Sequence, residues 1–297
     1  MRHFRPLTLF LLLGLTCPLP ARGQLIFDWP IRSGPQPESL LTGAEAVFWN
    51  PGNLAEAAGT MEELWVTHID GPDETGVRGL ALAGVFHLPV GFRAAAGYWH
   101  LGIPDIPITT DSPAQEMGTL EVAEDVAILG LARNGMGGVG LGGALRFQRG
   151  SAGGEHLTEM DGSLGMSITP RIPFSPRLGL ALTGLAQSPR ILAGLELGSR
   201  RLARGRIPIH LAYGIQRERG GKVTDHRVSL RGSWMERIHL GMGLSHWGEK
   251  EGWTPLWSLG VELGRYSFAI LRENLSNGFG PVHFYRGAIR FPPSGTR

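Results

Sequence analysis

The chain of 297 residues carries a formal net charge of +2, and only 18% of its residues are charged. It contains 45 glycines and 8 tryptophans, an unusual combination for a soluble protein, and a single cysteine, Cys17. The basic residues are scattered rather than arranged in a stripe, which argues against nucleic acid as a partner. Beyond the N-terminal segment, no run approaches the roughly twenty apolar residues that a membrane-spanning helix needs.

Residues 1–23 have the pattern of a cleavable secretory signal. A basic start (Arg2 to Arg5) precedes an apolar run from Leu7 to Leu15, which is too short to span a bilayer as a stable helix. The small residues in Ala21 to Gly23 fit the requirements of a signal peptidase. We therefore expect cleavage before Gln24.

Cys17 also allows a lipoprotein signal, but Leu15 and Thr16 before it fit the lipid-attachment consensus poorly. Removal of the secretory signal would leave a mature chain without cysteine. Neither disulfides nor thiolate zinc sites would then hold the chain together.

Residues 24–60 lack the alternation of a strand and contain several prolines, so we predict a separate N-terminal plug segment. We expect a short helix from Leu40 to Val47 that stops at Asn50-Pro51. Proline fixes its own φ and restricts the residue before it, while asparagine can hydrogen-bond nearby backbone. One interpretation is a stop that holds this segment inside or beneath a barrel. The other is an ordinary helix end in a soluble protein.

From residue 61 to residue 292, hydrophobic side chains recur with a period of two. For example, Leu240 and Met242 alternate with His239 and Gly241. Because successive side chains of a strand point to opposite faces, such a segment has one apolar and one small or polar face. Five segments show this pattern most clearly: Val139–Gln148, Ile207–Gln216, Arg227–Trp234, Ile238–Ser245 and Trp257–Gly264.

Alternation of this kind also occurs in a soluble β-sandwich, whose apolar faces look inward. Three features favour a transmembrane barrel: a secretory signal without disulfides, a glycine-rich polar face that suits a crowded lumen, and connections that alternate in length. Longer connections such as Gly102–Gly118 and Ser151–Glu155 alternate with four tight ones: Pro89-Val90, Asn134-Gly135, Met235-Glu236 and Gly264-Arg265. Outer-membrane barrels have short periplasmic turns and longer outer loops. The connections Thr169–Arg177 and Gly198–Arg206 are long where this pattern predicts short ones.

The sequence therefore predicts an all-β protein, an antiparallel transmembrane β-barrel of about 14 strands with a short N-terminal plug segment. The length leaves about twelve or fourteen strands open. The expected organisation is a signal peptide (1–23), a plug segment (24–60), a barrel (61–292) and a C-terminal tail (293–297). The first strands are predicted at 64–69, 78–88, 91–101, 119–132 and 137–148, and the last strand, Val282–Phe291, is expected to pair with the first.

The segment from Gly43 to Leu54 reads Gly-Ala-Glu-Ala-Val-Phe-Trp-Asn-Pro-Gly-Asn-Leu and resembles the Asn-Pro-Ala signature of the FadL-like outer-membrane barrels. It departs from that signature at Gly52, where alanine is usual. His226–Leu230 and Gly241–Leu244 are also similar to late strands of that group. The resemblance implies a fourteen-stranded barrel with an N-terminal segment in its lumen. The candidate site residues within the motif are Phe48, Asn50, Pro51 and Leu54.

The FadL-like group includes transporters of hydrophobic compounds and the PorV and PorQ proteins of type IX secretion. The short chain looks more like PorV or PorQ, which implies docking of secreted proteins or secretion-machine subunits at the bacterial outer membrane. The alternative is a FadL-like passive channel for small hydrophobic compounds, and a structural barrel is a third reading. A channel should have an apolar pocket and a kinked strand, whereas a docking protein should have a blocked lumen and an exposed apolar patch.

The sequence shows no constellation for catalysis, and we expect neither an enzyme nor a cofactor or metal. Ser245 and His246 are adjacent, but neighbours on a strand point to opposite faces, so they do not form a nucleophile and base. His239 and Glu262 are predicted to face the lumen on neighbouring strands and to form a structural polar contact. The acidic residues of the outer loops have no spacing that distinguishes them from solvated charge: Asp70, Asp73, Glu74, Asp105 and Asp111.

Overall fold

The computed structural model describes residues 35–56, 62–72, 76–109, 116–170, 172, 174–186, 189–202, 207–218, 224–246, 252–274 and 280–291. The predicted signal peptide (1–23) and C-terminal tail (293–297) lie outside the described residues.

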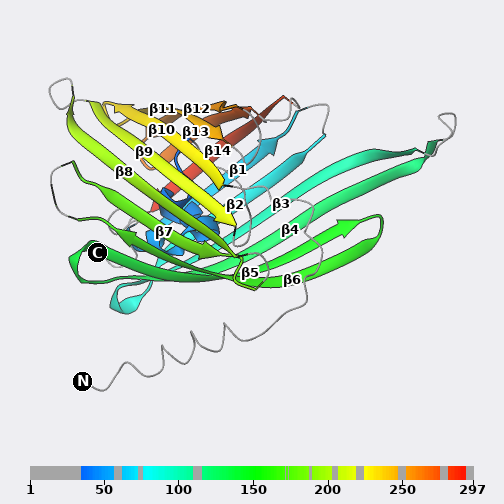
Figure 1. The fold of residues 1–297 in the computed structure, drawn as a ribbon, viewed down its shortest axis with the longest axis horizontal. Coiled ribbons are helices and arrows are strands. Elements are labelled where there is room, and N and C mark those ends of the chain that lie inside the picture. The colour runs from blue at the N-terminus through cyan, green and yellow to red at the C-terminus, as the bar shows by residue number, and fades with distance from the viewer. Residues whose placement is uncertain are drawn as a thin grey trace, which may run out of the picture.

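Within the described residues, fourteen antiparallel strands close into one barrel (Figure 1). Each strand pairs with its neighbours in sequence, and the last strand pairs with the first. The structure therefore confirms the all-β antiparallel fold and decides the strand number in favour of fourteen. The strands are β1 (Glu62–Asp70), β2 (Arg78–His87), β3 (Phe92–Thr109), β4 (Glu116–Asn134), β5 (Val139–Ala152), β6 (Glu155–Ile168), β7 (Arg177–Thr183), β8 (Arg190–Leu202), β9 (Ile207–Glu218), β10 (Thr224–Trp234), β11 (Ile238–His246), β12 (Thr254–Leu263), β13 (Tyr266–Asn274) and β14 (Pro281–Phe291).

The seam between β1 and β14 is continuous along both strands. Its register runs from the pair Glu62 and Phe291 to the pair Asp70 and His283. Because the barrel is closed at this seam, β1 and β14 are not edge strands, and each has a partner on both sides. The expected pairing of the last strand with the first is confirmed.

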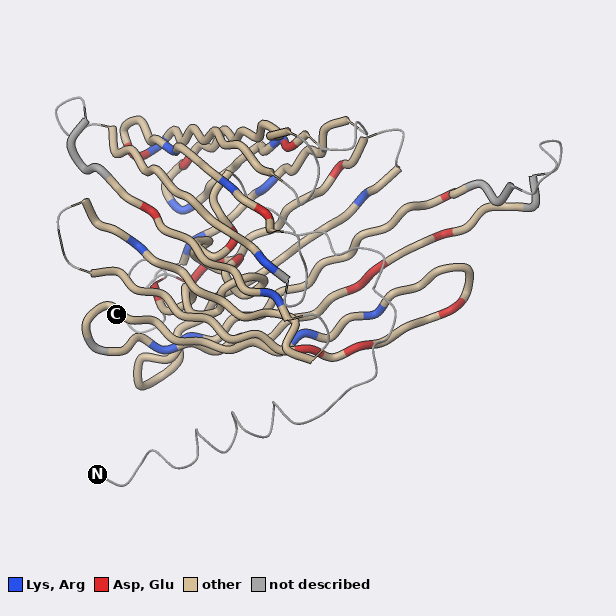
Figure 2. The backbone as a smooth tube through the Cα atoms, viewed as in Figure 1, with Lys and Arg blue, Asp and Glu red and all other residues tan. Residues whose placement is uncertain are grey.

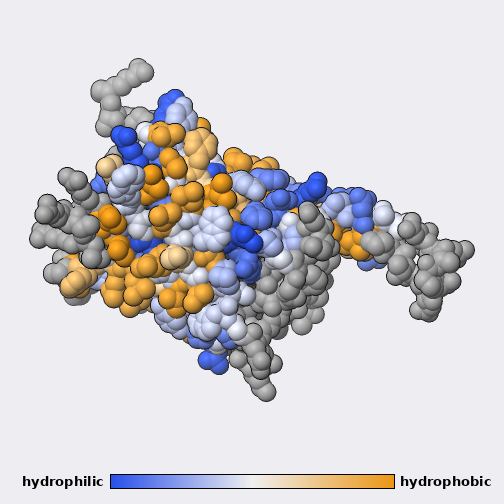
Figure 3. Space-filling model, turned by 90° about the horizontal axis from the view of Figure 1, so that it is seen from above, coloured by the Kyte–Doolittle hydropathy of each residue, from blue (hydrophilic) through white to orange (hydrophobic). Residues whose placement is uncertain are grey.

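Apolar side chains of the wall face outward, as the alternation predicted. Leu240 and Met242 are 58% and 63% exposed, while Gly241 between them is buried. An exposed apolar surface of this extent would be unfavourable in water, whereas in a membrane it is the surface that contacts the lipid acyl chains. Figure 3 shows hydrophobic side chains over much of one face of the wall, with hydrophilic ones more frequent toward the extension of β3 and β4.

Most short connections lie at one end of the barrel, here called the turn end, and the opposite end is called the loop end. The longer outer connection expected at Ser151–Glu155 is wrong, because β5 and β6 are joined at the loop end by Gly153-Gly154 alone. The tight turns predicted after β2, β4, β10 and β12 are all present. In the turn after β10, Met235 and Glu236 both have positive φ, 53° and 57°, as the tightest hairpin turns require. The connection between β6 and β7 stays long, as expected. The one between β8 and β9 does not, because β8 continues to Leu202 and leaves only residues 203–206.

The predicted outer loop Gly102–Gly118 is wrong, because β3 runs to Thr109 and β4 begins at Glu116. These additional residues pair with each other across a bulge between Ile103 and Ile106. Pro104 and Pro107 are tolerated here because β2 stops pairing with β3 at Gly102, which leaves this part of β3 as an edge strand.

Four strands rise beyond their neighbours at the loop end and form what we call the outer extension, the loop-end parts of β3 to β6 (Figure 1). On one side, pairing of β3 with β2 ends at Gly102. On the other side, pairing of β6 with β7 involves only Leu164–Ile168, so the rest of β6 has no partner from β7.

The predicted helix from Leu40 to Val47 is wrong. The segment instead forms short turns: η1 (Glu38–Leu40), η2 (Gly43–Glu45), α2 (Ala46–Trp49) and η3 (Pro51–Glu56). Leu41 is extended and Gly43 has a φ of +76°, a left-handed conformation that interrupts a helix. Among the described residues, no helix has the length and hydropathy to cross a membrane.

Candidate functional site

Residues 35–56, here called the strap, lie inside the barrel against its inner wall (Figure 1). η3 packs against β3 to β7, while η1 packs against β7 to β9. Leu40, Leu54, Asn50 and Asn53 are all 0% exposed. The strap therefore occupies the lumen as packed structure, although it has little regular secondary structure of its own.

Inward-facing glycines allow the strap backbone to approach the wall. A Cβ built on Gly179 of β7 would lie 1.9 Å from the carbonyl oxygen of Ser39, and one on Gly142 of β5 would lie 2.3 Å from that of Pro51. Real side chains cannot occupy such positions, so glycine is required by close approach rather than by a turn. Seven further glycines of the wall would place a Cβ within 3.0 Å of a strap atom: Gly97, Gly130, Gly140, Gly165, Gly194, Gly214 and Gly241.

Asn50 links the strap to itself and to β6. Its Nδ2 donates to the carbonyl oxygens of Ser39 at 2.8 Å and Met166 at 3.2 Å, while its Oδ1 accepts from the N–H of Gly52 at 3.1 Å. Asn53 donates to the same Ser39 carbonyl at 2.8 Å. The Asn50-Pro51 motif thus satisfies buried backbone groups that have no helix or sheet partner.

Phe48 and Leu54 supply apolar contacts on the side of β1, β3 and β4. The Phe48 ring lies 5.8 Å from that of Trp65 and 5.2 Å from that of Trp99, centroid to centroid. Leu54 belongs to the same buried hydrophobic cluster. The structure thus brings the four motif residues together in the strap, Pro51 lying against Gly142.

Ion pairs hold the strap at its polar positions. Glu38 lies 3.1 Å from Arg227 of β10, and both side chains are nearly buried. Glu45 pairs with Arg286 of β14. Arg177 of β7 donates to a strap carbonyl and lies 3.7 Å from Glu56. Sequence alternation placed such charges on the inner face, but nothing in the sequence indicated which strap residue each would meet.

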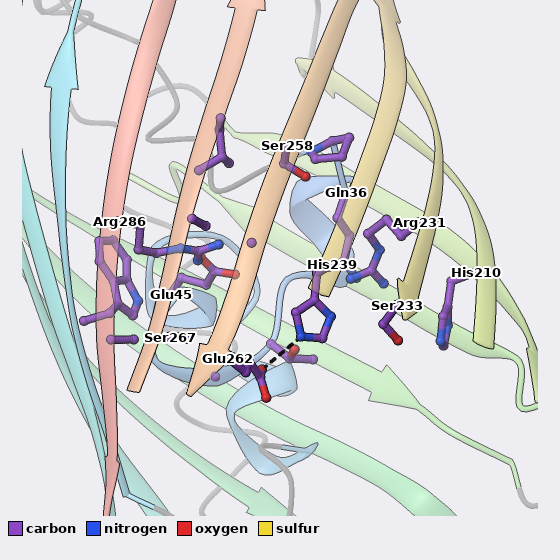
Figure 4. Close-up of a pocket in the computed structure, with 18 of the residues that line it drawn as sticks. Gln36, Glu45, His210, Arg231, Ser233, His239, Ser258, Glu262, Ser267 and Arg286 are labelled. Atoms are coloured by element: carbon purple, nitrogen blue, oxygen red, sulfur yellow. Dashed lines mark hydrogen bonds and ion pairs between the residues drawn. The ribbon is translucent and has the colours of Figure 1, made fainter. Parts of the chain in front are cut away.

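A cavity of about 660 Å³ lies between the strap and the opposite wall, formed by β10 to β14 and β1 (Figure 4). Its lining includes five glutamates, four arginines, two histidines and three serines. Glu63, His239 and Arg290 lie within two residues of the turn-end limits of their strands, so the cavity is at the turn end.

Two networks of polar contacts line the cavity. Arg290 contacts Glu63 at 3.3 Å and Glu262 at 3.0 Å, and His239 lies 3.4 Å from Glu262. The predicted approach of His239 to Glu262 across neighbouring strands is confirmed. Figure 4 shows both side chains directed into the cavity.

The second network surrounds Glu196 of β8. Its carboxylate accepts from Gln36 of the strap at 3.1 Å and contacts Arg177 at 3.4 Å, His210 at 3.2 Å and Arg231. In Figure 2, acidic and basic positions are interspersed over the strands rather than separated into two regions. Pairing of this kind compensates the cost of placing charges in a confined lumen.

Toward the loop end, hydrophobic side chains close the same side of the lumen. Ile69 of β1 and Val282 of β14 lie near the loop-end limits of their strands, and both are at most 3% exposed. They belong to the cluster that contains Trp65 and Leu271, which also line the cavity. The cavity is therefore backed by packed apolar side chains on its loop-end side.

The remaining sequence candidates stay apart. Ser245 faces inward and exchanges a hydrogen bond with Thr254 at 2.8 Å, whereas His246 faces outward against Trp253. Their predicted separation is confirmed. Among the residues that the structure describes, no group of three or more His, Cys, Asp or Glu side chains is arranged to hold a metal ion.

The sequence matches no family model and no curated protein. Solved structures resemble the fold instead. The toluene transporter TbuX of Ralstonia pickettii has a TM-score of 0.58 at 9% identity over 84% of this chain and 92% of its own. The toluene transporter TodX of Pseudomonas putida has a TM-score of 0.56 at 11% identity, with 90% and 98% covered. A deletion mutant of the monoaromatic hydrocarbon channel TodX scores 0.57 at 12% identity, with 84% and 94% covered. The chain thus has the fold of FadL-type outer-membrane barrels.

Proposed function

We propose that the protein is a channel for small molecules in the bacterial outer membrane. The observation that carries this proposal is the cavity of about 660 Å³ left between the strap and the wall of the barrel. A space of that volume is typical of small-molecule sites. The structural neighbours are named as toluene and hydrocarbon transporters, which supports the channel reading over docking of secreted proteins.

The lining of the cavity favours solutes that have both an apolar and a polar part. Trp65 and Leu271 supply apolar surface, while Glu262, His239 and Arg290 supply polar groups. A pure hydrocarbon would displace water from these charged groups without replacing their hydrogen bonds, which is costly. The cavity is thus partly apolar and partly charged, whereas a channel for hydrophobic compounds was expected to have an apolar pocket.

Uptake into liposomes tests the proposal. Liposomes that contain the full-length protein should take up benzoate faster than protein-free liposomes, and toluene should gain less. Liposomes that contain an unrelated β-barrel protein, whose lumen is closed, serve as the control. If all three preparations took up benzoate at one rate, and toluene likewise, the result would contradict a channel.

We further propose that residues 24–60 act as a plug whose described part is the strap. A polar-lined barrel of about fourteen strands is wider than the roughly eight-stranded size that side chains alone can fill. In potassium chloride the intact protein should conduct only weakly in planar bilayers, whereas deletion of residues 36–55 should raise the conductance many-fold. The deletion variant must first show the heat-dependent gel migration of a folded barrel. A folded variant that conducts as weakly as the intact protein would refute the plug.

Docking of secreted proteins or secretion-machine subunits, in the manner of PorV and PorQ, is the second candidate. The outer extension favours it, because β6 from Glu155 to Met160 lacks a β7 partner and projects beyond the wall. Free strand edges are common sites of recognition by β-pairing. Removal of residues 149–152 and 155–158 shortens this edge, keeps the Gly153-Gly154 turn, and should then block secretion without affecting solute uptake. Unchanged secretion would exclude docking through this surface.

A further inference from the structure

The outward-facing histidines of the barrel are confined to one end. Of the nine histidines in the described residues, six face outward. Five of these lie in the loop-end part of their strands, and His100 lies midway along β3, opposite Leu80 near the loop end of β2. One of them, His156, lies on the outer extension, beyond the pairing of β6 with β7. The other five are His68, His100, His226, His246 and His283. They follow the loop-end border of the apolar belt around the barrel.

Four of these side chains belong to two aromatic groups. On β9 to β11, the Tyr213 hydroxyl lies 2.7 Å from His226 Nδ1, and the ring of His246 lies 6.2 Å from that of His226. On β1 and β14, the Tyr285 ring stacks at 6.3 Å from His68 and at 6.4 Å from His283. Each group presents ring nitrogens at the outer surface of the wall rather than in the lumen.

Arginines accompany the histidines at the same level. Arg272 of β13 lies opposite His283 in the strand register. Arg217 of β9 is paired with Thr224, two residues from His226. Both face outward by the alternation of their strands, as does Arg78, whose neighbour across the register is Asp70. The loop-end border thus combines guanidinium cations with imidazole groups, and the acids on the same face are Asp70 and Asp125, which lies 2.9 Å from His100.

The turn-end border of the same outer face differs in having no outward histidine among the described residues, although Arg133 and Arg265 lie there over the rings of Phe92 and Tyr266. On the strands at that border the exposed aromatic side chains are Phe86, Trp234, Tyr266 and Phe268, at 39% to 57% exposure. Tryptophan, tyrosine and phenylalanine suffice for an interfacial girdle, since their rings are amphipathic. A girdle needs no histidine, so the outward imidazole groups distinguish the loop-end border.

We propose that the loop-end border binds the phosphate groups of phosphorylated glycolipid in the leaflet that surrounds the barrel. Phosphate oxygens accept hydrogen bonds from imidazole N–H and guanidinium, and such charge-assisted bonds are stronger than neutral ones. The geometry favours lipid as the ligand, because the two aromatic groups lie at the loop-end border of the apolar belt and point away from the lumen. Acyl chains on the belt would place headgroups beside His226 and His283.

Native mass spectrometry of the full-length protein in detergent tests this proposal. The probes are bisphosphorylated lipid A and the same lipid without phosphates. The unmodified protein should retain the phosphorylated form with at least tenfold preference, since two charge-assisted bonds supply more than a tenfold difference in affinity. The variant H68Q/H226Q/H246Q/H283Q should lose most of that preference. The matched control H156Q changes an outward histidine above the belt and should keep it.

Folding of each variant is verified by heat-dependent gel migration, and R272Q provides a second variant that leaves every histidine in place. It should lower the preference partially. Equal retention of both lipids by the unmodified protein would overturn the proposal, as would an equal loss in H156Q and the fourfold variant. Displacement of bound lipid by inorganic phosphate at the lipid's own concentration would indicate a free-phosphate site and would also overturn it.

Discussion

The wall from β3 to β9 and the wall from β10 through β14 to β1 face the same lumen, yet they are built from different side chains. Where the strap lies, the wall presents glycines such as Gly142 and Gly179, onto which backbone packs directly. Across the lumen, the wall presents serines and charged side chains around the cavity. The comparison shows that one period-two pattern of small and polar residues serves two purposes: backbone contact on one side, and the lining of a polar cavity on the other.

The largest effect is expected when a charge is introduced on the lipid-facing side of the cavity wall and compared with the same charge on the lumen-facing side. Leu240→Arg puts a cation on the lipid-facing side and should cost about 2–4 kcal/mol. His239→Arg, one residue away, places the cation in the polar cavity beside Glu262 and should cost less than about 1 kcal/mol. Urea unfolding in lipid vesicles measures both. Equal destabilisation would mean that the cavity wall is as intolerant of charge as lipid is.

A glycine-to-alanine substitution on each wall distinguishes the wall that contacts the strap backbone from the wall that lines the cavity. Gly179→Ala brings a Cβ against the Ser39 carbonyl and should cost about 1–3 kcal/mol, the usual penalty of overpacking. Gly260→Ala meets its nearest atom at 3.5 Å, an ordinary contact, and should be neutral within about 0.5 kcal/mol. Folded fractions after refolding into lipid give the readout. A neutral Gly179→Ala would show that the strap can shift away from the wall.

Loss of Asn50 should affect the strap more than loss of a cavity hydroxyl affects the barrel. Asn50→Ala leaves the Ser39 and Met166 carbonyls without this donor and should cost about 1–2 kcal/mol. Ser258→Ala on the cavity wall should change stability by less than about 0.5 kcal/mol. Protease cleavage within the strap and unfolding midpoints measure the two effects. If both variants behave alike, Asn50 does not anchor the strap.

The sequence predicted those parts of the fold that depend on local periodicity. Leu240 and His239 point to opposite faces because side chains of a strand alternate, and the tight turn at Met235-Glu236 follows from the short interval between two such strands. The resemblance at Asn50-Pro51 located the strap motif in the chain.

The sequence did not predict features that depend on distant partners. The continuation of β3 and β4 beyond Gly102 depends on mutual pairing of residues that carry two prolines and a bulge. The turns of the strap replace a helix because Gly43 adopts a left-handed φ and because buried carbonyls find Asn50 and Asn53. Likewise, the glycines were visible as a pattern, whereas the strap atoms that they face are more than a hundred residues away in some cases, as for Gly179 and Ser39.

The seating of the strap on glycines of consecutive strands has a consequence for assembly. Its bulky residues Leu40 and Phe48 are buried against glycines of β8 and β3, two strands that lie far apart in the chain. The surface on which the strap packs therefore does not exist until the wall has formed, so folding of the strap depends on pairing of the strands.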